Sequence, residues 1–476
     1  MTTMAARDAT MYWLSRRTAN DVFLLYSFAE TDTATDELRD FVAARAARIP
    51  DLRIRLQEIP GNLGYPRWVP AEFTSQQFTH HRPDGLSWQA LLADLGELLG
   101  TGVVATEYPW RIHVFRGVHG APRSTEPVVV VVLQLSHALA DGTRAAAIAR
   151  ALFGTAVDEG VVHSTPGVPV DNSAYHPVGP AQTSTPPVDS CGQPCGWIAR
   201  RVDPRVIGVL RFPGQLAATV WRGRAAYLAQ RELADRTAAG EVPAAAPGFA
   251  PSALNPASPV ADHTVRMLVV DVDDLRIPGK TVTVVALTAI SSALVDYLAE
   301  RGARPERLGT ALPMALPAPS EARNNYRGLA IDLHIDEPDL RLRANLIADD
   351  LATRRERALN PLFSAQDRVG EVVPAVLAVR DVERADLDDV PALLDGNTVV
   401  SSVYRGQGDL AFAGGPVLFT GGFPALGTVM HLTHGVHGIG ETITLSVHSD
   451  PRVMPDPDRY LQLLAESLDR VVAAHR

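Results

Sequence analysis

The chain has 476 residues, a formal net charge of −10 and a pI near 5.8. This acidic balance argues against nucleic acid as the main partner. Hydrophobic residues make up 46% of the chain, which allows a large core, and the length favours two or three domains.

The sequence shows no segment of the kind that directs or anchors a chain to a membrane. Residues 1–17 lack the apolar stretch of a secretory signal. The most apolar long stretch, residues 281–298, carries Thr288, Ser291 and Asp296, so we predict a buried helix rather than a transmembrane segment. No Lys/Arg run forms an electrostatic membrane anchor. We expect a cytoplasmic protein, and the sequence leaves room for peripheral association with a membrane or lipid inclusion.

The first third of the chain predicts alternating helices and strands. The apolar periodicity predicts a short helix leading into a strand, two amphipathic helices and three strands. In chain order these are the helix and strand at 20–29, a helix at 35–48, strands at 52–56 and 67–69, a helix at 86–99 and a strand at 111–115.

The most informative segment is His137-Ala138-Leu139-Ala140-Asp141-Gly142. It follows an apolar run at 127–135 that predicts a buried strand, and it precedes an alanine-rich helix predicted at 143–152. An HxxxDG pattern would occur by chance in roughly one such chain in twenty, so its context matters. A strand end followed by a helix gives a histidine a rigid platform.

This pattern predicts a general base. His137 is the candidate base, Asp141 would fix the loop and orient the imidazole through a cationic partner, and Gly142 allows close approach of backbone and substrate. Arg405 is a candidate for that cation. The alternative is that Asp141 and Gly142 only cap the helix that follows.

Two Pro-rich connectors separate the halves of the chain. They cover residues 157–194 and 238–259, and a helical segment is predicted between them at 197–233. Cys191 and Cys195 lie in the first connector without CxxC spacing or a second pair, so we expect two ordinary thiols rather than a zinc site.

The second half repeats the α/β pattern, which predicts domains at 1–156 and 263–476 with the connector region 157–262 between them. The predicted elements are strands at 265–270, 308–314, 328–335, 398–403, 428–433 and 442–447, and helices at 281–298, 338–360 and 456–474.

Other polar and glycine patterns in the second half have ordinary interpretations. Four histidines lack acidic or Cys partners at ligand spacing, so we predict no metal site. The pairs Gly414-Gly415 and Gly421-Gly422 lack the Lys-Ser/Thr of a phosphate loop and are interpreted as turns. The histidines are His431, His434, His437 and His448.

Taken in chain order, the HxxxDG segment and the predicted elements on either side of it resemble the bacterial wax ester synthase/diacylglycerol acyltransferase family. That family lies within the superfamily of chloramphenicol acetyltransferases and condensation domains. The resemblance covers nearly the whole chain, through residues 20–25, residues 49–69, Leu254-Asn255-Pro256, Thr281-Val282 with the following helix, and Asn325.

The resemblance implies an α/β (α+β) fold of two condensation-domain-like subdomains. Each would be a mixed sheet flanked by helices, with a tunnel between them and His137 near its middle. It implies an O-acyltransferase that moves an acyl group from an acyl thioester, expected to be acyl-CoA, to a long-chain alcohol, diacylglycerol or other hydroxyl acceptor. Neither a cofactor, a metal nor a covalent acyl-enzyme would be needed. The implied catalytic residues are His137, Asp141 and Gly142, and the implied substrate-binding residues are Ser136, Trp110 and Asn325.

Several motifs depart from the family pattern. Ser136 stands where the first of two adjacent histidines is usual, and Tyr108-Pro109-Trp110 replaces Pro-Leu-Trp. Thr283-Val284 replaces Asn-Asp, and residues 401–406 replace the Ser-Asn-Val-Pro-Gly-Pro block. Two alternatives therefore stay open: a condensation-like enzyme acting on a small alcohol or amine, and a non-catalytic member that binds a lipid or a partner protein.

Overall fold

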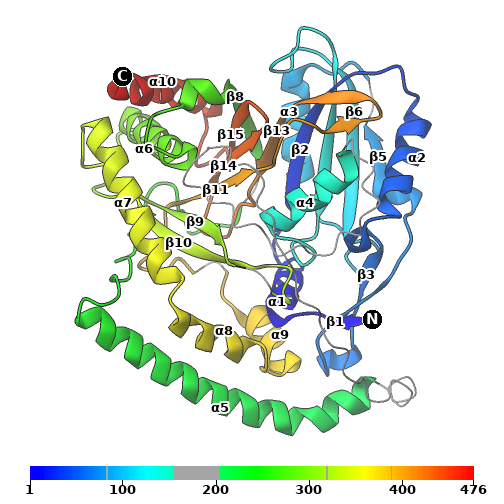
Figure 1. Ribbon diagram of the computed structural model, residues 1–476, viewed down its shortest axis with the longest axis vertical. Helices are drawn as coiled ribbons and strands as arrows, with labels where there is room; N and C mark the ends of the chain where they lie inside the picture. Colours follow the sequence, from blue (N-terminus) through cyan, green and yellow to red (C-terminus); the bar gives the residue numbers. More distant parts are fainter. Residues whose placement is uncertain (82–83, 155–203, 261, 318–319, 388) are drawn as a thin grey trace, which may run out of the picture.

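The computed structural model describes residues 1–81, 84–154, 204–260, 262–317, 320–387 and 389–476. It contains two six-stranded sheets side by side and a small three-stranded sheet below them (Figure 1). The connector at 157–194, with Cys191 and Cys195, lies outside the described residues.

The first sheet carries the predicted buried strand at its centre. Its order is β12-β13-β2-β7-β6-β5, and all eight residues of β7 are buried. The side chains of α2 and α4 share a core with one face, and those of α3 share a core with the other. The bounds are β2 Val22–Ala29, α2 Thr35–Ala46, β5 Phe78–His81, α3 Trp88–Leu99, β6 Trp110–Val118, β7 Val128–Leu135, α4 Gly142–Phe153, β12 Ala411–Phe412 and β13 Gly415–Phe423.

The second sheet has the order β10-β9-β11-β14-β15-β8, with α6, α7 and α10 in its core. The helix α6 is long and apolar enough to cross a membrane, but 78% of its apolar window is buried inside the protein, as expected of a core helix. The bounds are β8 Thr264–Asp271, α6 Val282–Glu300, β9 Gly309–Ala315, β10 Tyr326–Asp332, α7 Leu340–Ala358, β11 Thr398–Tyr404, β14 Leu432–Ile439, β15 Thr442–Ser449 and α10 Pro457–His475.

The remaining elements include a small third sheet and a long outer helix. The small sheet has the order β1-β4-β3, and the long helix α5 runs along the outside of the molecule beyond α8 and α9 (Figure 1). The bounds are β1 Thr2–Thr3, α1 Ala6–Leu14, η1 Pro50–Leu52, β3 Ile54–Gln57, η2 Pro60–Asn62, β4 Arg67–Pro70, η3 Ser75–Gln77, α5 Pro204–Ala238, η4 Val272–Leu275, η5 Pro361–Phe363, α8 Ser364–Gly370 and α9 Ala375–Arg384.

Three sequence-based predictions of elements were wrong. The short helix expected to lead into the strand within residues 20–29 does not form, because β2 already begins at Val22, and residues 23–28 are all buried since core side chains cover both faces. The strand predicted at 428–433 begins only at Leu432. Gly421-Gly422 lies inside β13 rather than in a turn.

The glycines of β13 allow the two sheets to approach each other closely. A Cβ at Gly435 of β14 would overlap the carbonyl oxygen of Gly422, and a Cβ at Gly421 would overlap the Met267 side chain. We call Gly421, Gly422 and Gly435 the glycine seam. Because β13 pairs with β2, residues of the predicted 263–476 unit complete the first sheet, so the predicted domain boundary does not separate the two sheets.

Candidate active site

The structure places His137 in a short turn at the end of the central strand, as the sequence predicts. The strand β7 ends at Leu135 and α4 begins at Gly142. The Ser136 N–H donates to the Pro109 carbonyl (2.8 Å), and the Leu139 N–H donates to the Ser136 carbonyl (2.8 Å). These backbone bonds hold the turn against the start of β6.

Asp141 binds two backbone N–H groups, one from each half of the chain. Its Oδ1 accepts from Arg144 (2.9 Å) and caps α4, and its Oδ2 accepts from Asn325 (2.9 Å). The helix-capping interpretation is therefore confirmed, and the bond to Asn325 adds a second role. The predicted pairing with Arg405 was wrong, because that guanidinium donates to Thr420 and to the Gly421 carbonyl instead.

The imidazole of His137 is partly buried beside Tyr326, with ring centroids 6.2 Å apart. Its carbonyl accepts a hydrogen bond from the Asn324 side chain (2.7 Å). Its Nδ1 is buried and has no hydrogen-bond partner among the described residues. The main chain of His137 is thus fixed by a hydrogen bond, while its ring is only partly buried.

A buried carboxylate on α1 holds Asn324 in place. Asp8 is 1% exposed and accepts from the N–H groups of Arg323 and Asn324 (2.9 Å each) and from the Asn324 side chain (3.0 Å). Burial raises the pKa of Asp8 even though these bonds favour its charged form. Asp8 therefore links the N-terminal helix to the His137 turn through one asparagine.

An ion-pair cluster completes the junction. Asp51 accepts from Arg323 (2.7 Å) and from Arg144 (2.9 Å). Burial alone would raise the pKa of Asp51, but the two guanidinium groups lower it. The cluster ties the start of α4 to the segment that carries Asn324. We call Asp8, His137, Asp141, Asn324 and Asn325 the polar seam.

The sequence did not predict Asp8, Asp51, Arg323 or Asn324 as site residues. Asp8 and Asn324 are 316 positions apart in sequence, so local spacing carries no signal of their contact. The resemblance pointed to the neighbouring Asn325, whose side chain instead donates to the Leu316 carbonyl (3.0 Å). Its contribution to the seam is its main-chain N–H.

The remaining predicted site residues differ in their surroundings. Ser136 is buried next to His137 in sequence, and β11 approaches the turn, since a Cβ at Gly142 would lie 3.6 Å from the Val403 side chain. Trp110 is fully buried, donates to the Leu52 carbonyl (3.0 Å) and stacks on Phe73. This packing gives Trp110 a structural role, and its contact with substrate stays a prediction.

Three of the four histidines of the second half, His431, His434 and His448, form hydrogen bonds with other side chains. His434 bonds to the Tyr460 hydroxyl (2.8 Å) and His448 to His263 (2.8 Å), and burial lowers the pKa of each to about 3. Within the described ranges, no three His, Cys, Asp or Glu side chains gather in a way that could hold a metal ion.

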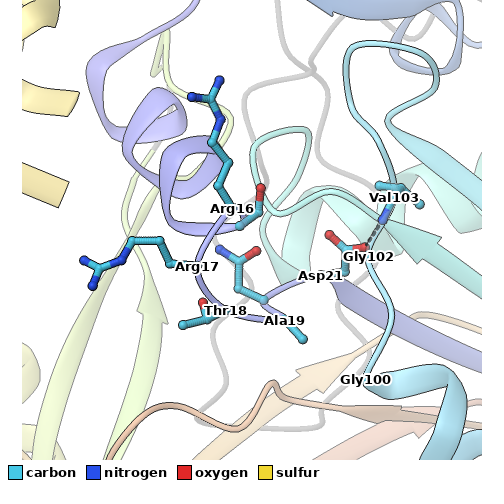
Figure 2. Close-up of a pocket in the computed structure, with 10 residues that line it drawn as sticks. Arg16, Arg17, Thr18, Ala19, Asp21, Gly100, Gly102 and Val103 are labelled. Atoms are coloured by element: carbon cyan, nitrogen blue, oxygen red, sulfur yellow. Dashed lines mark hydrogen bonds between the residues drawn. The ribbon is translucent and has the colours of Figure 1, made fainter. Parts of the chain in front are cut away.

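A pocket of about 250 Å³ opens between the segment after α1 and the end of α3 (Figure 2). Asp21 in its wall accepts from the Val103 N–H and from Gln134 (2.8 Å each), and burial raises the pKa of Asp21 to about 6. Since Val22 pairs with Leu135, the pocket lies at the same end of the sheet as the His137 turn. His137 is not among its lining residues.

Comparisons with protein families and with known proteins agree with this architecture. The family model described as wax ester synthase/diacylglycerol acyltransferase catalytic domain matches residues 4–276, and the WS/DGAT C-terminal domain matches residues 324–471. A comparison with curated protein sequences finds no significant match.

Among solved structures, the chain is similar to a wax ester synthase/diacylglycerol acyltransferase from Marinobacter aquaeolei VT8, with TM-score 0.61 and 16% identity over 99% of this chain and 98% of that one. A mutant starter condensation domain of rhizomide synthetase, in complex with C8-CoA and Leu-SNAC, gives 0.53 and 11% over 100% and 94%. The TRI3 trichothecene 15-O-acetyltransferase from Fusarium sporotrichioides gives 0.52 and 12% over 100% and 95%. These identities are low, so the likenesses concern the fold, and the two-sheet architecture expected from the sequence is confirmed.

Proposed function

The chain belongs to the wax ester synthase/diacylglycerol acyltransferase family of O-acyltransferases, and from this premise we propose that it transfers an acyl group from acyl-CoA to a hydroxyl acceptor with His137 as general base. The observation that carries the proposal is the His137 turn. Its main chain is held by Asn324 from the other half of the chain, and its ring is only partly buried, beside Tyr326.

In the proposed reaction the imidazole accepts the proton of the acceptor hydroxyl while the oxygen attacks the thioester carbonyl carbon. The new O–C bond gives a tetrahedral intermediate, the C–S bond then breaks, and the imidazolium returns the proton to the leaving thiolate. An imidazole takes up and releases protons near neutral pH, so no metal or covalent acyl-enzyme is required. The helix cap by Asp141 would keep the turn in place through both proton transfers.

The choice of acyl-CoA as donor is supported by the structural relative that was solved with C8-CoA. The acceptor is proposed to be a long-chain alcohol or diacylglycerol, in line with the family description. We propose a cytoplasmic enzyme, because its expected donor is a soluble thioester.

A small alcohol or amine is the second candidate acceptor. Thr283 at the start of α6 bonds to Ser402 of β11 (2.8 Å), where the family usually has an Asn-Asp pair and a Ser-Asn sequence. This hydroxyl pair belongs to the two blocks in which the chain departs from the family. Replacing the usual family residues by this hydroxyl pair would alter the side chains that the acceptor contacts, while the proposed base, His137, is kept.

The test is an assay of thiol release from acyl-CoA with a panel of long-chain alcohols, diacylglycerol, small alcohols and amines. The wild-type protein should release thiol with at least one acceptor, and His137→Ala should lower the rate about 10²–10⁴-fold, the usual contribution of a general base. The exposed His119 provides the matched control, and His119→Ala should keep full activity.

Two results would contradict the proposal. Undiminished turnover by folded His137→Ala would exclude His137 as the base. Absence of acyl transfer with every acceptor, from a protein that melts cooperatively, would instead favour the non-catalytic binding role.

A further inference from the structure

The phenol of Tyr326, at the start of β10, lies beside the imidazole of His137, with ring centroids 6.2 Å apart. No other aromatic ring in the described part of the chain contacts that imidazole. We propose that Tyr326 is a further catalytic residue, whose hydroxyl donates a hydrogen bond to the thioester carbonyl oxygen as this oxygen becomes negatively charged. This role rests on the proposed function, because it belongs to the same acyl transfer.

Tyr326 belongs to a segment that is bonded to the His137 turn. The Asn324 side chain donates to the His137 carbonyl (2.7 Å), and the Asn325 main-chain N–H donates to the carboxylate that caps α4 (2.9 Å). The Tyr326 carbonyl accepts from Arg7 of α1 (3.1 Å), where the end of β10 reaches this helix (Figure 1). Main-chain hydrogen bonds before and after Tyr326 thus fix its position, and an oxyanion donor must be in place before the reaction begins.

The Tyr326 hydroxyl makes no hydrogen bond to another described residue, and the residue is only partly buried. The hydroxyls of Tyr12, Tyr65 and Tyr460, by contrast, bond to a carboxylate, a carbonyl and an imidazole of the protein. A tyrosine hydroxyl that is taken out of water usually finds such a partner. A phenylalanine would pack beside His137 equally well, so packing accounts for the ring and leaves the hydroxyl available to a substrate.

The surroundings of Tyr326 keep its phenol protonated. Burial raises the pKa of Tyr326 above its usual value, although the nearby Arg7 acts in the opposite direction. An unperturbed phenol already has a pKa near 10, so the hydroxyl carries its proton throughout the neutral range. A protonated phenol is a hydrogen-bond donor, which is the property that an oxyanion requires of its partner.

The hydrogen bond from the phenol strengthens and weakens with the charge on the substrate oxygen. When the acceptor oxygen bonds to the thioester carbon, an electron pair of the C=O bond moves to the carbonyl oxygen. The phenol keeps its own proton and donates a hydrogen bond to this oxyanion. When the C–S bond breaks, the electron pair re-forms the C=O bond. The phenol therefore stabilises the transition state more than the ground state, and such a difference raises kcat.

The experiment compares Tyr326→Phe with the wild type in the thiol-release assay, using an acceptor that the wild-type protein accepts. The substitution keeps the ring beside His137 and removes only the hydroxyl. We expect kcat to fall about 10²–10³-fold, the usual effect of removing one oxyanion donor, with KM unchanged for both substrates. The pH dependence of kcat should keep its wild-type midpoint, because the phenol acts on the substrate oxygen and leaves the imidazole unchanged.

Tyr65→Phe is the matched control. The Tyr65 hydroxyl donates to the Val373 carbonyl (2.9 Å), so it already has a structural partner. Its removal should lower the melting temperature and leave kcat at the wild-type value. Tyr326→Phe should show the reverse, a wild-type melting temperature with a low kcat, because the Tyr326 hydroxyl bonds to no other described residue.

Three results would overturn the role of Tyr326 while an inactive His137→Ala still supports the base. The first is a wild-type kcat in folded Tyr326→Phe. The second is a raised KM for the acceptor at unchanged kcat, because the phenol would then bind the ground state. The third is a shifted midpoint of the pH profile, because the phenol would then act through the imidazole. Absence of acyl transfer by the wild type would contradict the proposed function, and the role of Tyr326 with it.

Discussion

The two halves of the protein meet along two seams of different chemistry. At the polar seam, Asn324 donates to the His137 carbonyl and to the Asp8 carboxylate, and the Asn325 main-chain N–H donates to Asp141. At the glycine seam, strands of the two sheets approach so closely that side chains do not fit. Hydrogen bonds are directional and can orient a group, whereas close packing sets only a separation. The difference indicates that the polar seam fixes the turn where we propose that the chemistry takes place, and that the glycine seam holds the sheets together.

Both seams bury a titratable group whose charged form is disfavoured. Burial raises the pKa of Asp8 in the polar seam, and burial and the nearby Arg405 lower the pKa of His437, which lies against Gly435. Their pH dependence is opposite in sign. Asp8 stabilises the fold less as pH rises from 3.8 toward its folded pKa, and His437 stabilises it less as pH falls below 6.5.

The largest expected effect comes from filling the glycine seam. Gly435→Ala should lower the free energy of unfolding by about 3 kcal/mol, because the new methyl group would overlap the Gly422 carbonyl and the His437 ring. Chemical denaturation measures this. The control is Gly328→Ala in β10 of the same sheet, where nothing lies within 4 Å of an added Cβ. Equal stability of the two variants would show that the seam is not tightly packed.

A smaller change at the polar seam should act mainly on activity. Asn324→Ala removes the donor to the His137 carbonyl, and we expect kcat to fall about 10- to 100-fold with a loss of about 2 kcal/mol in stability. Asn325→Ala is the matched control, because it keeps the main-chain bond to Asp141. A fall of kcat in Asn325→Ala as large as in Asn324→Ala would contradict the assigned division of roles, and a change confined to KM would support the predicted substrate contact of Asn325.

The third prediction concerns the pH dependence of the glycine seam. The unfolded chain protonates His437 below pH 6.5 whereas the folded protein keeps it neutral, so acid should destabilise the fold. His437→Gln should reduce the slope of the free energy of unfolding against pH below 6.5 by up to about 1.4 kcal/mol per pH unit. Denaturation series at several pH values measure this. The exposed His119 serves as the control, and an unchanged slope in His437→Gln would contradict neutral burial.

The smallest effect is expected at Trp110, whose ring stacks on Phe73 and donates to the Leu52 carbonyl. Trp110→Phe loses the hydrogen bond to the Leu52 carbonyl and should destabilise the protein by about 1 kcal/mol. Because the ring is fully buried, kcat and KM should stay at the wild-type values. A raised KM with unchanged kcat would instead support the predicted substrate contact.

Local sequence patterns predicted much of the fold and the first part of the site. The run of buried residues in β7, the turn at His137 and the start of α4 follow from apolar runs and a helix cap within a few residues of each other. The same logic predicted a short helix within residues 20–29 that does not form, because an apolar run buried on both faces has no alternation that distinguishes strand from helix.

Contacts between distant segments could not be predicted from spacing. Asp8 and Asn324 form their bonds only once the two halves have docked, and neither residue belongs to a pattern of its own. Gly421-Gly422 was interpreted as a turn because glycine is common in turns, whereas here it serves close approach of two strands. The family resemblance, which covers nearly the whole chain, predicted the arrangement of two sheets that local spacing could not predict.

The pairing of β13 with β2 also has a consequence for synthesis on the ribosome. One edge of β2 stays unpaired from the synthesis of β2 until the synthesis of β13, which begins at Gly415. At typical translation speeds this interval is about 20–80 s. During that time the nascent chain displays an open, apolar strand edge, which is a site for aggregation or for chaperone binding. A circular permutant that joins the original termini and begins just before residue 411 makes residues 411–476 ahead of β2, and it should therefore raise the yield of folded protein at high expression.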